Sequence, residues 1–281
     1  MTKVGVGHRT ELAPWIDSCP PEIECLEITA EHFAEPKRRH RLRSLAQKYP
    51  VMLHSLGLSL GTPGPLDARL LQQFADIAAD ADPLWLSEHI GFCRADEIDL
   101  GHFNPVPPSP DTVRIMADHA REVVETCNRP LILENITANL RVKGSLSETE
   151  FLNRLSEESG CGLLLDVTNL FVNSRNHGFD PYAWFRDVDP HRIVQLHVVG
   201  YTRADGRWHD FHQEPMQDEL WRLMCAVLAY ATPQAVIIER DANFPPIDEL
   251  ETELRRIKAA VRQPAGAGRG ERPKAVSLSA E

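Results

Sequence analysis

Eight short apolar runs recur along the chain, and they constrain its fold more than any other feature. They are almost continuously apolar rather than alternating, which is typical of parallel strands covered by helices. Stretches with helical periodicity, such as 68–79, 112–127, 148–159 and 219–231, lie between most of them. The runs are Val4–Gly7, Ile23–Ile28, Val51–Leu56, Leu84–Ile90, Leu131–Ile136, Gly162–Val167, Ile193–Val199 and Ala235–Arg240.

Eight strand–helix units in 281 residues predict an α/β fold of the (β/α)8 TIM-barrel type. The alternative is a doubly wound open sheet. Gly5 and Gly7 of the first run form a G-x-G pattern, but no third glycine completes the dinucleotide-binding turn of that fold. We therefore expect a single barrel domain over residues 1–261. Residues 262–281 are rich in Gly, Ala, Pro and charge, which predicts a disordered tail.

The charge balance narrows the range of partners. The chain has 30 Lys and Arg against 41 Asp and Glu, a formal net charge of −11. This disfavours nucleic acid and anionic membranes, because phosphates are repelled. No apolar run is long enough to cross a bilayer, and the first residues lack the apolar core of a signal peptide. We expect a cytoplasmic protein whose six cysteines are reduced thiols.

The residues that end the runs carry the functional signal. In TIM barrels the active site lies at the carboxyl ends of the strands. Six successive runs end in an imidazole or a carboxylate there, and the loop after the seventh run adds two more such residues, spaced to face one side of an extended segment. The eight are His54, His89, Glu134, Asp166, His197, Asp210, His212 and Glu239.

This mixture of donors predicts a metal centre. Burying several carboxylates together is prohibitive without cations, and borderline metals prefer imidazole mixed with carboxylate. A metal-free acid/base site is the competing interpretation. Eight donors exceed what one ion uses, so two or three ions are expected, with Glu134 as a bridge. Iron, manganese and zinc all fit the donors; magnesium and calcium fit poorly.

Other polar residues near the strand ends are expected to have supporting roles. Asn135 and Asp241 follow two of the proposed ligands and are expected to contact ligands or substrate. By contrast, His40, His119 and His191 lie in charged or helical surroundings, which predicts surface positions.

Several longer motifs together resemble a known family. They span nearly the whole chain up to about residue 258. The chain resembles the multinuclear non-heme iron-dependent oxidases, bacterial barrel enzymes that modify ribosomal peptides and include the enzyme acting on methanobactin precursors. The motifs are LEITAEHF at 26–33, MLHSLGLSLG at 52–61, LSEHIGF at 86–92, LILENI at 131–136, GCGLLLDVTNLFVNSRNHGFDP at 160–181, QLHVVG at 195–200, DFHQEPM at 210–216 and IIERDANFP at 237–245.

The resemblance implies an iron- and dioxygen-dependent oxidation of a precursor peptide, at cysteine side chains. It implies two or three iron ions of mixed Fe2+ and Fe3+ state, and a separate partner protein that presents the peptide. It also adds Asn169 to the ligands and places His177 near the ligands or substrate. The implied catalytic residues are His54, Glu134, Asp166, His197 and Glu239. The implied ligands are His54, His89, Glu134, Asp166, Asn169, His197, Asp210, His212 and Glu239.

The sequence departs from the family pattern at three positions near the rim, His8, His32 and Tyr201, which leaves substrate choice open. Two rival functions also remain. One is a zinc or manganese barrel enzyme, either an endonuclease, which the net charge disfavours, or a sugar isomerase, which would be expected to place a Lys at a strand end. The other is a non-catalytic peptide-binding barrel, which would not need so many metal ligands.

Overall fold

The computed structural model describes residues 1–95 and 98–262, and a closed parallel barrel forms its centre. Around the ring the strands run β1–β2–β3–β4–β7–β8–β9–β12, so the predicted TIM barrel is confirmed. Each of the eight apolar runs contains or overlaps one barrel strand. The strands are β1 (Lys3–Gly7), β2 (Cys25–Thr29), β3 (Val51–His54), β4 (Leu86–His89), β7 (Leu131–Glu134), β8 (Gly162–Asp166), β9 (Ile193–Val198) and β12 (Ala235–Ile238).

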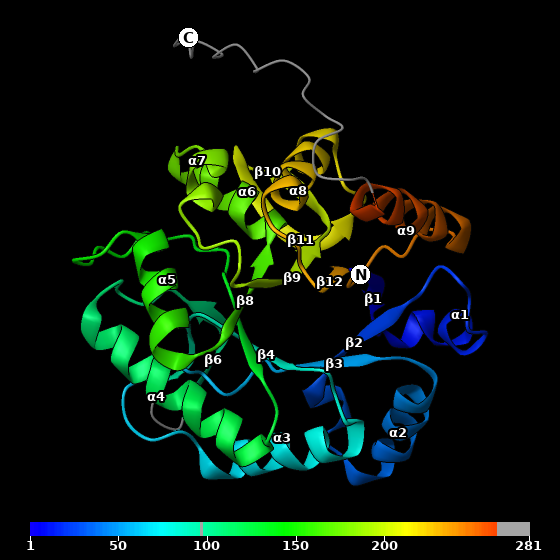
Figure 1. The fold of residues 1–281 in the computed structure, drawn as a ribbon, viewed down its shortest axis with the longest axis horizontal. Helices are drawn as coiled ribbons and strands as arrows, with labels where there is room; N and C mark the ends of the chain where they lie inside the picture. The colour runs from blue at the N-terminus through cyan, green and yellow to red at the C-terminus, as the bar shows by residue number, and fades with distance from the viewer. Residues whose placement is uncertain (96–97, 263–281) are drawn as a thin grey trace, which may run out of the picture.

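Helices surround the barrel in chain order (Figure 1). Four helices were predicted with their ends. The helix predicted at 148–159 begins and ends there, and those predicted at 68–79, 112–127 and 219–231 differ from the observed helices by two residues at most at either end. N-cap side chains explain sharp starts, as at Asp67, Ser109 and Ser147. The helices are α1 (Ala13–Asp17), α2 (Arg39–Lys48), α3 (Ala68–Ala81), α4 (Pro110–Cys127), α5 (Glu148–Ser159), α6 (Val167–His177), α7 (Pro181–Arg186), α8 (Asp218–Tyr230) and α9 (Ile247–Arg262).

Two antiparallel hairpins interrupt the strand–helix alternation, and the sequence did not predict them. One consists of β5 (Phe92–Ala95) and β6 (Ile98–Asn104) and follows β4; the other consists of β10 (Gly200–Ala204) and β11 (Arg207–Glu214) and follows β9. Both leave the barrel at the carboxyl ends of strands, where the predicted metal ligands lie. The second hairpin carries Asp210 and His212.

The barrel interior is filled rather than hollow. A cluster that includes Met52, Trp85 and Ile237 occupies it below the carboxyl ends of the strands. Gly5 is required on β1, because a Cβ there would lie 2.0 Å from the Cys25 carbonyl oxygen of β2. The larger apolar core lies between the barrel and its helices.

The carboxyl-terminal limit of the barrel lies at the end of α9. That helix includes Arg262, the residue at which the sequence places the start of a tail, and the remainder of that predicted tail lies outside the described residues. Within 1–95 and 98–262, no helix combines the length and apolar character that a bilayer crossing requires.

Candidate metal centre

Strand register brings the predicted donors together. His89 on β4 is the register partner of Glu134 on β7, and Asp166 on β8 is that of His197 on β9. Paired residues of adjacent parallel strands point to the same side of the sheet. Since these pairs stand at the carboxyl ends, all four side chains enter one space at the barrel mouth.

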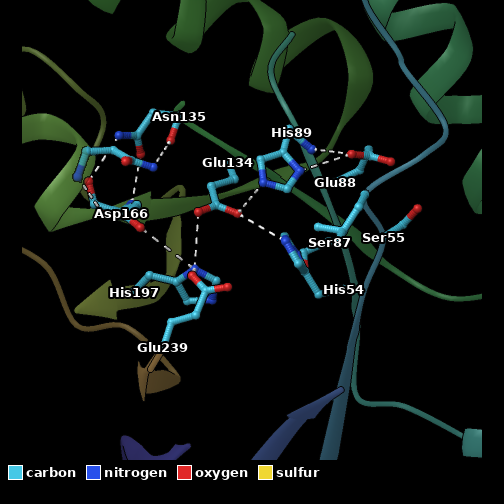
Figure 2. A network of polar contacts seen from close by, with 12 residues as sticks. His54, Ser55, Ser87, Glu88, His89, Glu134, Asn135, Asp166, His197 and Glu239 are labelled. Atoms are coloured by element: carbon cyan, nitrogen blue, oxygen red, sulfur yellow. Dashed lines mark hydrogen bonds and ion pairs between the residues drawn. The ribbon is translucent and has the colours of Figure 1, made fainter. Parts of the chain in front are cut away.

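A first group of donors forms around one oxygen of Glu134. Nε2 of His54 and Nε2 of His89 each lie 3.5 Å from Glu134 Oε2, and Figure 2 shows both imidazoles pointing toward that carboxylate. Donor atoms of all three residues lie within 4.8 Å of one another. Phe103 of β6 stacks on the His89 ring at a centroid distance of 3.8 Å and covers it.

A second group forms around the other oxygen of the same carboxylate. His197 Nδ1 lies 3.1 Å from Glu134 Oε1, 3.0 Å from Glu239 Oε2 and 4.0 Å from Asp166 Oδ2. Donor atoms of these four residues also lie within 4.8 Å of one another. Glu134 therefore stands between two groups with one oxygen toward each, the arrangement expected of a bridging carboxylate.

The β10–β11 hairpin supplies a third group. His212 Nε2 lies 2.8 Å from Asp210 Oδ2, and both residues meet Asp166 within 4.8 Å. The backbone of His212 adopts a left-handed conformation with φ of 53°, which is uncommon for any residue but glycine. Asn176 on α6 anchors the hairpin through paired hydrogen bonds with the Trp208 main chain, of 2.8 and 3.1 Å.

Each of the four imidazoles has a fixed partner on its other ring nitrogen. A carboxylate partner fixes the tautomer of three of them, as in the carboxylate–histidine pairs of metalloproteins, and the Ser87 hydroxyl can accept from His54 in the same way, so that each ring keeps one lone pair for a metal ion. His197 thus presents Nδ1 to the centre, whereas the other three present Nε2. The partner contacts are His54 Nδ1 with Ser87 Oγ (2.8 Å), His89 Nδ1 with Glu88 Oε1 (3.2 Å), His197 Nε2 with Glu27 Oε1 (2.7 Å) and His212 Nδ1 with Asp241 Oδ2 (3.1 Å).

The carboxylates crowded into this buried space shift the pKa values of their neighbours. Burial, together with the neighbouring Asp210 and Glu134 charges, raises the pKa of Asp166 well above its ordinary value. Burial alone would lower the pKa of His197, but the carboxylates around it outweigh burial and raise that pKa well above the ordinary value. In the absence of a cation, protons bound to Asp166 and His197 offset part of the negative charge of these carboxylates.

Three buried carboxylate oxygens have no hydrogen-bond donor in the described part of the chain. They are Oε2 of Glu134, Oδ2 of Asp166 and Oδ1 of Asp210, one for each of the three groups. Buried polar atoms are almost always paired, so unpaired acceptors at three adjacent points indicate cation positions. The donor set therefore fits metal ions at each group.

The remaining predicted residues lie in a polar ladder between α6 and the segment after β7. Asn169 Nδ2 donates to Asn135 O (3.1 Å), and Asn169 Oδ1 accepts from Thr137, which leaves this oxygen a second lone pair; Asn169 also lines the large cavity. One turn on, Asn173 bonds the Ile136 carbonyl and the Ala138 amide. One further turn on, His177 Nε2 lies 2.7 Å from Ala138 O. The resemblance places His177 near the ligands or substrate. Its observed contact is with the main chain of the segment that follows Glu134.

Asn135 also holds a proposed ligand in place. Its side chain bonds both the amide and the carbonyl of Asp166, at 2.9 and 3.0 Å. The predicted contact of Asp241 with a ligand is present as well, through His212. Arg9, which follows β1, holds Asp241 through an Nε–Oδ1 bond of 2.7 Å and lies 3.5 Å from Glu239 Oε1.

Sequence reasoning missed the residues that support the imidazoles from below. Glu27 and Gln195 lie one layer deeper in the barrel, and Trp85 donates to Gln195 Oε1 at 2.8 Å. Glu88 and Ser87 precede His89 on β4. The signal was present, because Glu27, Glu88 and Gln195 are polar residues inside otherwise apolar runs.

A cavity of about 1010 Å³ opens above the centre. Its floor includes Glu134, Asp210 and Glu239, and Phe103 and Phe211 stand in its wall. Its size lies at the upper end of small-molecule pockets, about 300–1,000 Å³, so it can receive several residues of a peptide.

Comparison with known proteins places the chain among peptide-modifying enzymes. A family model described as the RiPP precursor modification enzyme MbnB/TglH/ChrH matches residues 3–262, where RiPP denotes a ribosomally synthesised and post-translationally modified peptide. A UPF0276 protein of Shewanella amazonensis is 35% identical over 278 residues, which cover 94% of this chain and 98% of the relative. A UPF0276 protein of Pseudomonas aeruginosa is 35% identical over 244 residues, 86% of each chain.

Solved structures with little sequence identity share the fold. Endonuclease IV from Thermus thermophilus matches with a TM-score of 0.60 at 16% identity, covering 92% of this chain and 98% of the other. A D-psicose 3-epimerase crystallised with D-fructose matches with a TM-score of 0.59 at 14% identity, covering 92% and 97%. At these identities the likeness establishes the barrel architecture alone.

Proposed function

The chain belongs to the MbnB/TglH/ChrH family of RiPP precursor modification enzymes, and from that premise we propose that it oxidises cysteine side chains of a precursor peptide with iron and dioxygen. The observation that supports this proposal most is the set of three adjacent donor groups, each with an unpaired buried carboxylate oxygen. We also propose a separate protein that presents the full-length precursor; short peptides supplied in excess should reach the cavity without it.

We assign the ions to the three groups. His54, His89 and Glu134 would hold one ion, and Glu134 with Asp166, His197 and Glu239 would hold a second. Asp210 and His212, with Asp166, would hold a third. Asn169 is proposed as an additional ligand through the free lone pair of Oδ1. When bound, iron supplies Lewis acidity that favours a thiolate at neutral pH and a redox couple for dioxygen.

The chain's own side chains determine how such a centre works. Glu134 fixes the spacing of the first two groups, because each of its oxygens faces a different one. Glu27 and Asp241 hold the rings of His197 and His212, so neither imidazole reorients when substrate enters. Phe103 shields His89 from solvent, and the cavity leaves room for the peptide above.

Metal analysis and turnover test this proposal together. The purified chain would be loaded with ferrous iron without oxygen, and iron per chain would be measured by mass spectrometry. A pool of Ac-Xaa4-Cys-Xaa4-amide peptides would then be added with dioxygen, and peptide mass loss and oxygen uptake recorded. We expect two or three irons per wild-type chain and oxidised peptides, and loss of both iron and turnover in His54→Ala and Glu134→Ala.

A variant outside the metal centre serves as the control for this test. Glu150→Gln, in a half-exposed surface ion pair of α5, should behave as wild type. Unchanged iron content and turnover in both His54→Ala and Glu134→Ala would refute the site. Zinc-supported activity without oxygen uptake would instead favour the hydrolase or isomerase alternative.

A further inference from the structure

A second cavity, of about 460 Å³, lies beside the metal centre and has a different chemical character. Leu146, Phe151 and Phe179 line it, so much of its wall is apolar, whereas the floor of the larger cavity is charged. Glu148 also lines it, and its carboxylate accepts from Trp184 Nε1 at 3.1 Å. The segment at 138–146 forms one side of it. Ile136 and Leu140 line both cavities, so the second cavity lies directly beside the one above the metal ligands.

The wall between the two cavities is preformed. It is the segment 135–138, which the polar ladder fixes to α6 through Asn169, Asn173 and His177. Its fixed main chain directs Ile136 and Ala138 into the apolar cavity. A preformed pocket binds without the entropy cost of ordering its wall, so its shape can select a ligand group.

The rim of this cavity carries exposed apolar and basic side chains. Leu140 and Val142 are large apolar residues with exposed side chains, 74% and 36% exposed. Between and beside them stand Arg141 and Lys143, two cations in a chain of net charge −11. A partner for this rim therefore combines an apolar residue with acidic neighbours.

We propose that this cavity binds one bulky apolar side chain of the precursor peptide, at a fixed number of residues from the one held at the metal centre. The assignment rests on the proposed peptide substrate and adds its anchor. The adjacent position of the two cavities favours this occupant over a separate ligand, since a chain lying across Ile136 and Leu140 contacts both. Acidic residues beside the anchor would face Arg141 and Lys143.

Filling the cavity tests the proposal without touching the metal donors. Ala138 joins the ladder only through its main chain, so Ala138→Phe places a ring in the cavity and keeps those bonds, whereas Ala138→Ser is the matched control. Iron-loaded, oxygen-free proteins would capture peptides from the Ac-Xaa4-Cys-Xaa4-amide pool, and mass spectrometry would identify them. Iron content and circular dichroism would confirm that each variant is intact.

We expect wild type and Ala138→Ser to enrich Leu, Ile or Phe at least fivefold at one position relative to Cys, with Asp or Glu beside it. Ala138→Phe should lose that preference. If Ala138→Phe does not fold, Val142→Asp, at the exposed rim, replaces it. No apolar preference in wild type, no peptide capture, or an unchanged preference in the filled variant would overturn the assignment.

A second pool with Ser in place of Cys separates this inference from the proposed function. Equal capture of both pools with the same apolar preference would contradict the thiol chemistry and leave the anchor intact. Capture that needs Cys but shows no apolar preference would support the thiol chemistry and contradict the anchor.

Discussion

Replacing Glu27 by Gln should weaken metal binding at the His197 group, although Glu27 itself is not a proposed ligand. Glu27 Oε1 accepts from His197 Nε2 at 2.7 Å, and Gln195 Nε2 donates to the other Glu27 oxygen. An amide at position 27 turns one of these oxygens into a donor. If the oxygen of the new amide keeps the hydrogen bond with His197 Nε2, the NH₂ of that amide faces the NH₂ of Gln195.

The surrounding network cannot absorb this change. Rotating the Gln195 amide would relieve the conflict, but its NH₂ would then face the Trp85 indole N–H, which now donates to Gln195 Oε1 at 2.8 Å. All these side chains are buried, so one donor stays unpaired, at about 1–3 kcal/mol. Losing a carboxylate partner also makes His197 a weaker ligand, and such losses typically cost 10–100-fold in metal affinity.

The expected result is therefore a 10–100-fold lower affinity at this group, about 1.4–2.7 kcal/mol. Competition with a chromophoric chelator would measure it, with Glu150→Gln as the surface control. Trp85→Phe removes the opposing N–H and lets Gln195 rotate, so the double variant should recover about 1 kcal/mol relative to additivity. Wild-type affinity in Glu27→Gln, or strictly additive effects in the double variant, would refute the reasoning.

Three further predictions concern stability. Metal removal should lower Tm in calorimetry by at least about 8–16 °C, since a single ion at 1,000 times its Kd contributes about 4 kcal/mol and each kcal/mol is worth about 2–4 °C; equal values with and without chelator would argue against structural ions. Asn173→Ala should lower the free energy of unfolding by about 2–4 kcal/mol in urea titrations, because a buried main-chain carbonyl and a part-buried main-chain amide lose their partners, whereas Asn176→Ala, in a half-buried site, should cost less. Gly5→Ala should cost at least about 1–3 kcal/mol, since its Cβ would meet a β2 carbonyl at 2.0 Å, while Gly57→Ala, with 3.4 Å of clearance, should be near neutral.

The barrel was predictable because its signal is local. Each strand that is covered on both faces must be apolar throughout, so Val51–His54 or Leu131–Glu134 can be recognised from a few residues. The polar residue that ends such a run is predictable for the same reason, since the strand end defines the barrel mouth. Thus the six strand-end donors were identified and the structure gathers them at one mouth.

What sequence reasoning missed depends on tertiary contacts. The β10–β11 hairpin is only partly buried, and its position over the mouth depends on Asn176 of a different element. Likewise, His119 was predicted at the surface and this was wrong: it is 7% exposed and bonds the Leu60 and Gly64 carbonyls, which a charged helix does not reveal.

The charges around the mouth bear on the number of ions. Seven carboxylates belong to the centre or touch its imidazoles, against one guanidinium, that of Arg9. With neutral imidazoles, as metal ligands require, seven negative charges and one positive leave −6. Three divalent or two trivalent cations would neutralise this, whereas one ion would leave most of it uncompensated among carboxylates that, apart from the half-exposed Asp241, are largely buried. The partners of the imidazoles, and not only the ligands, therefore favour a multinuclear centre. The seven are Glu27, Glu88, Glu134, Asp166, Asp210, Glu239 and Asp241.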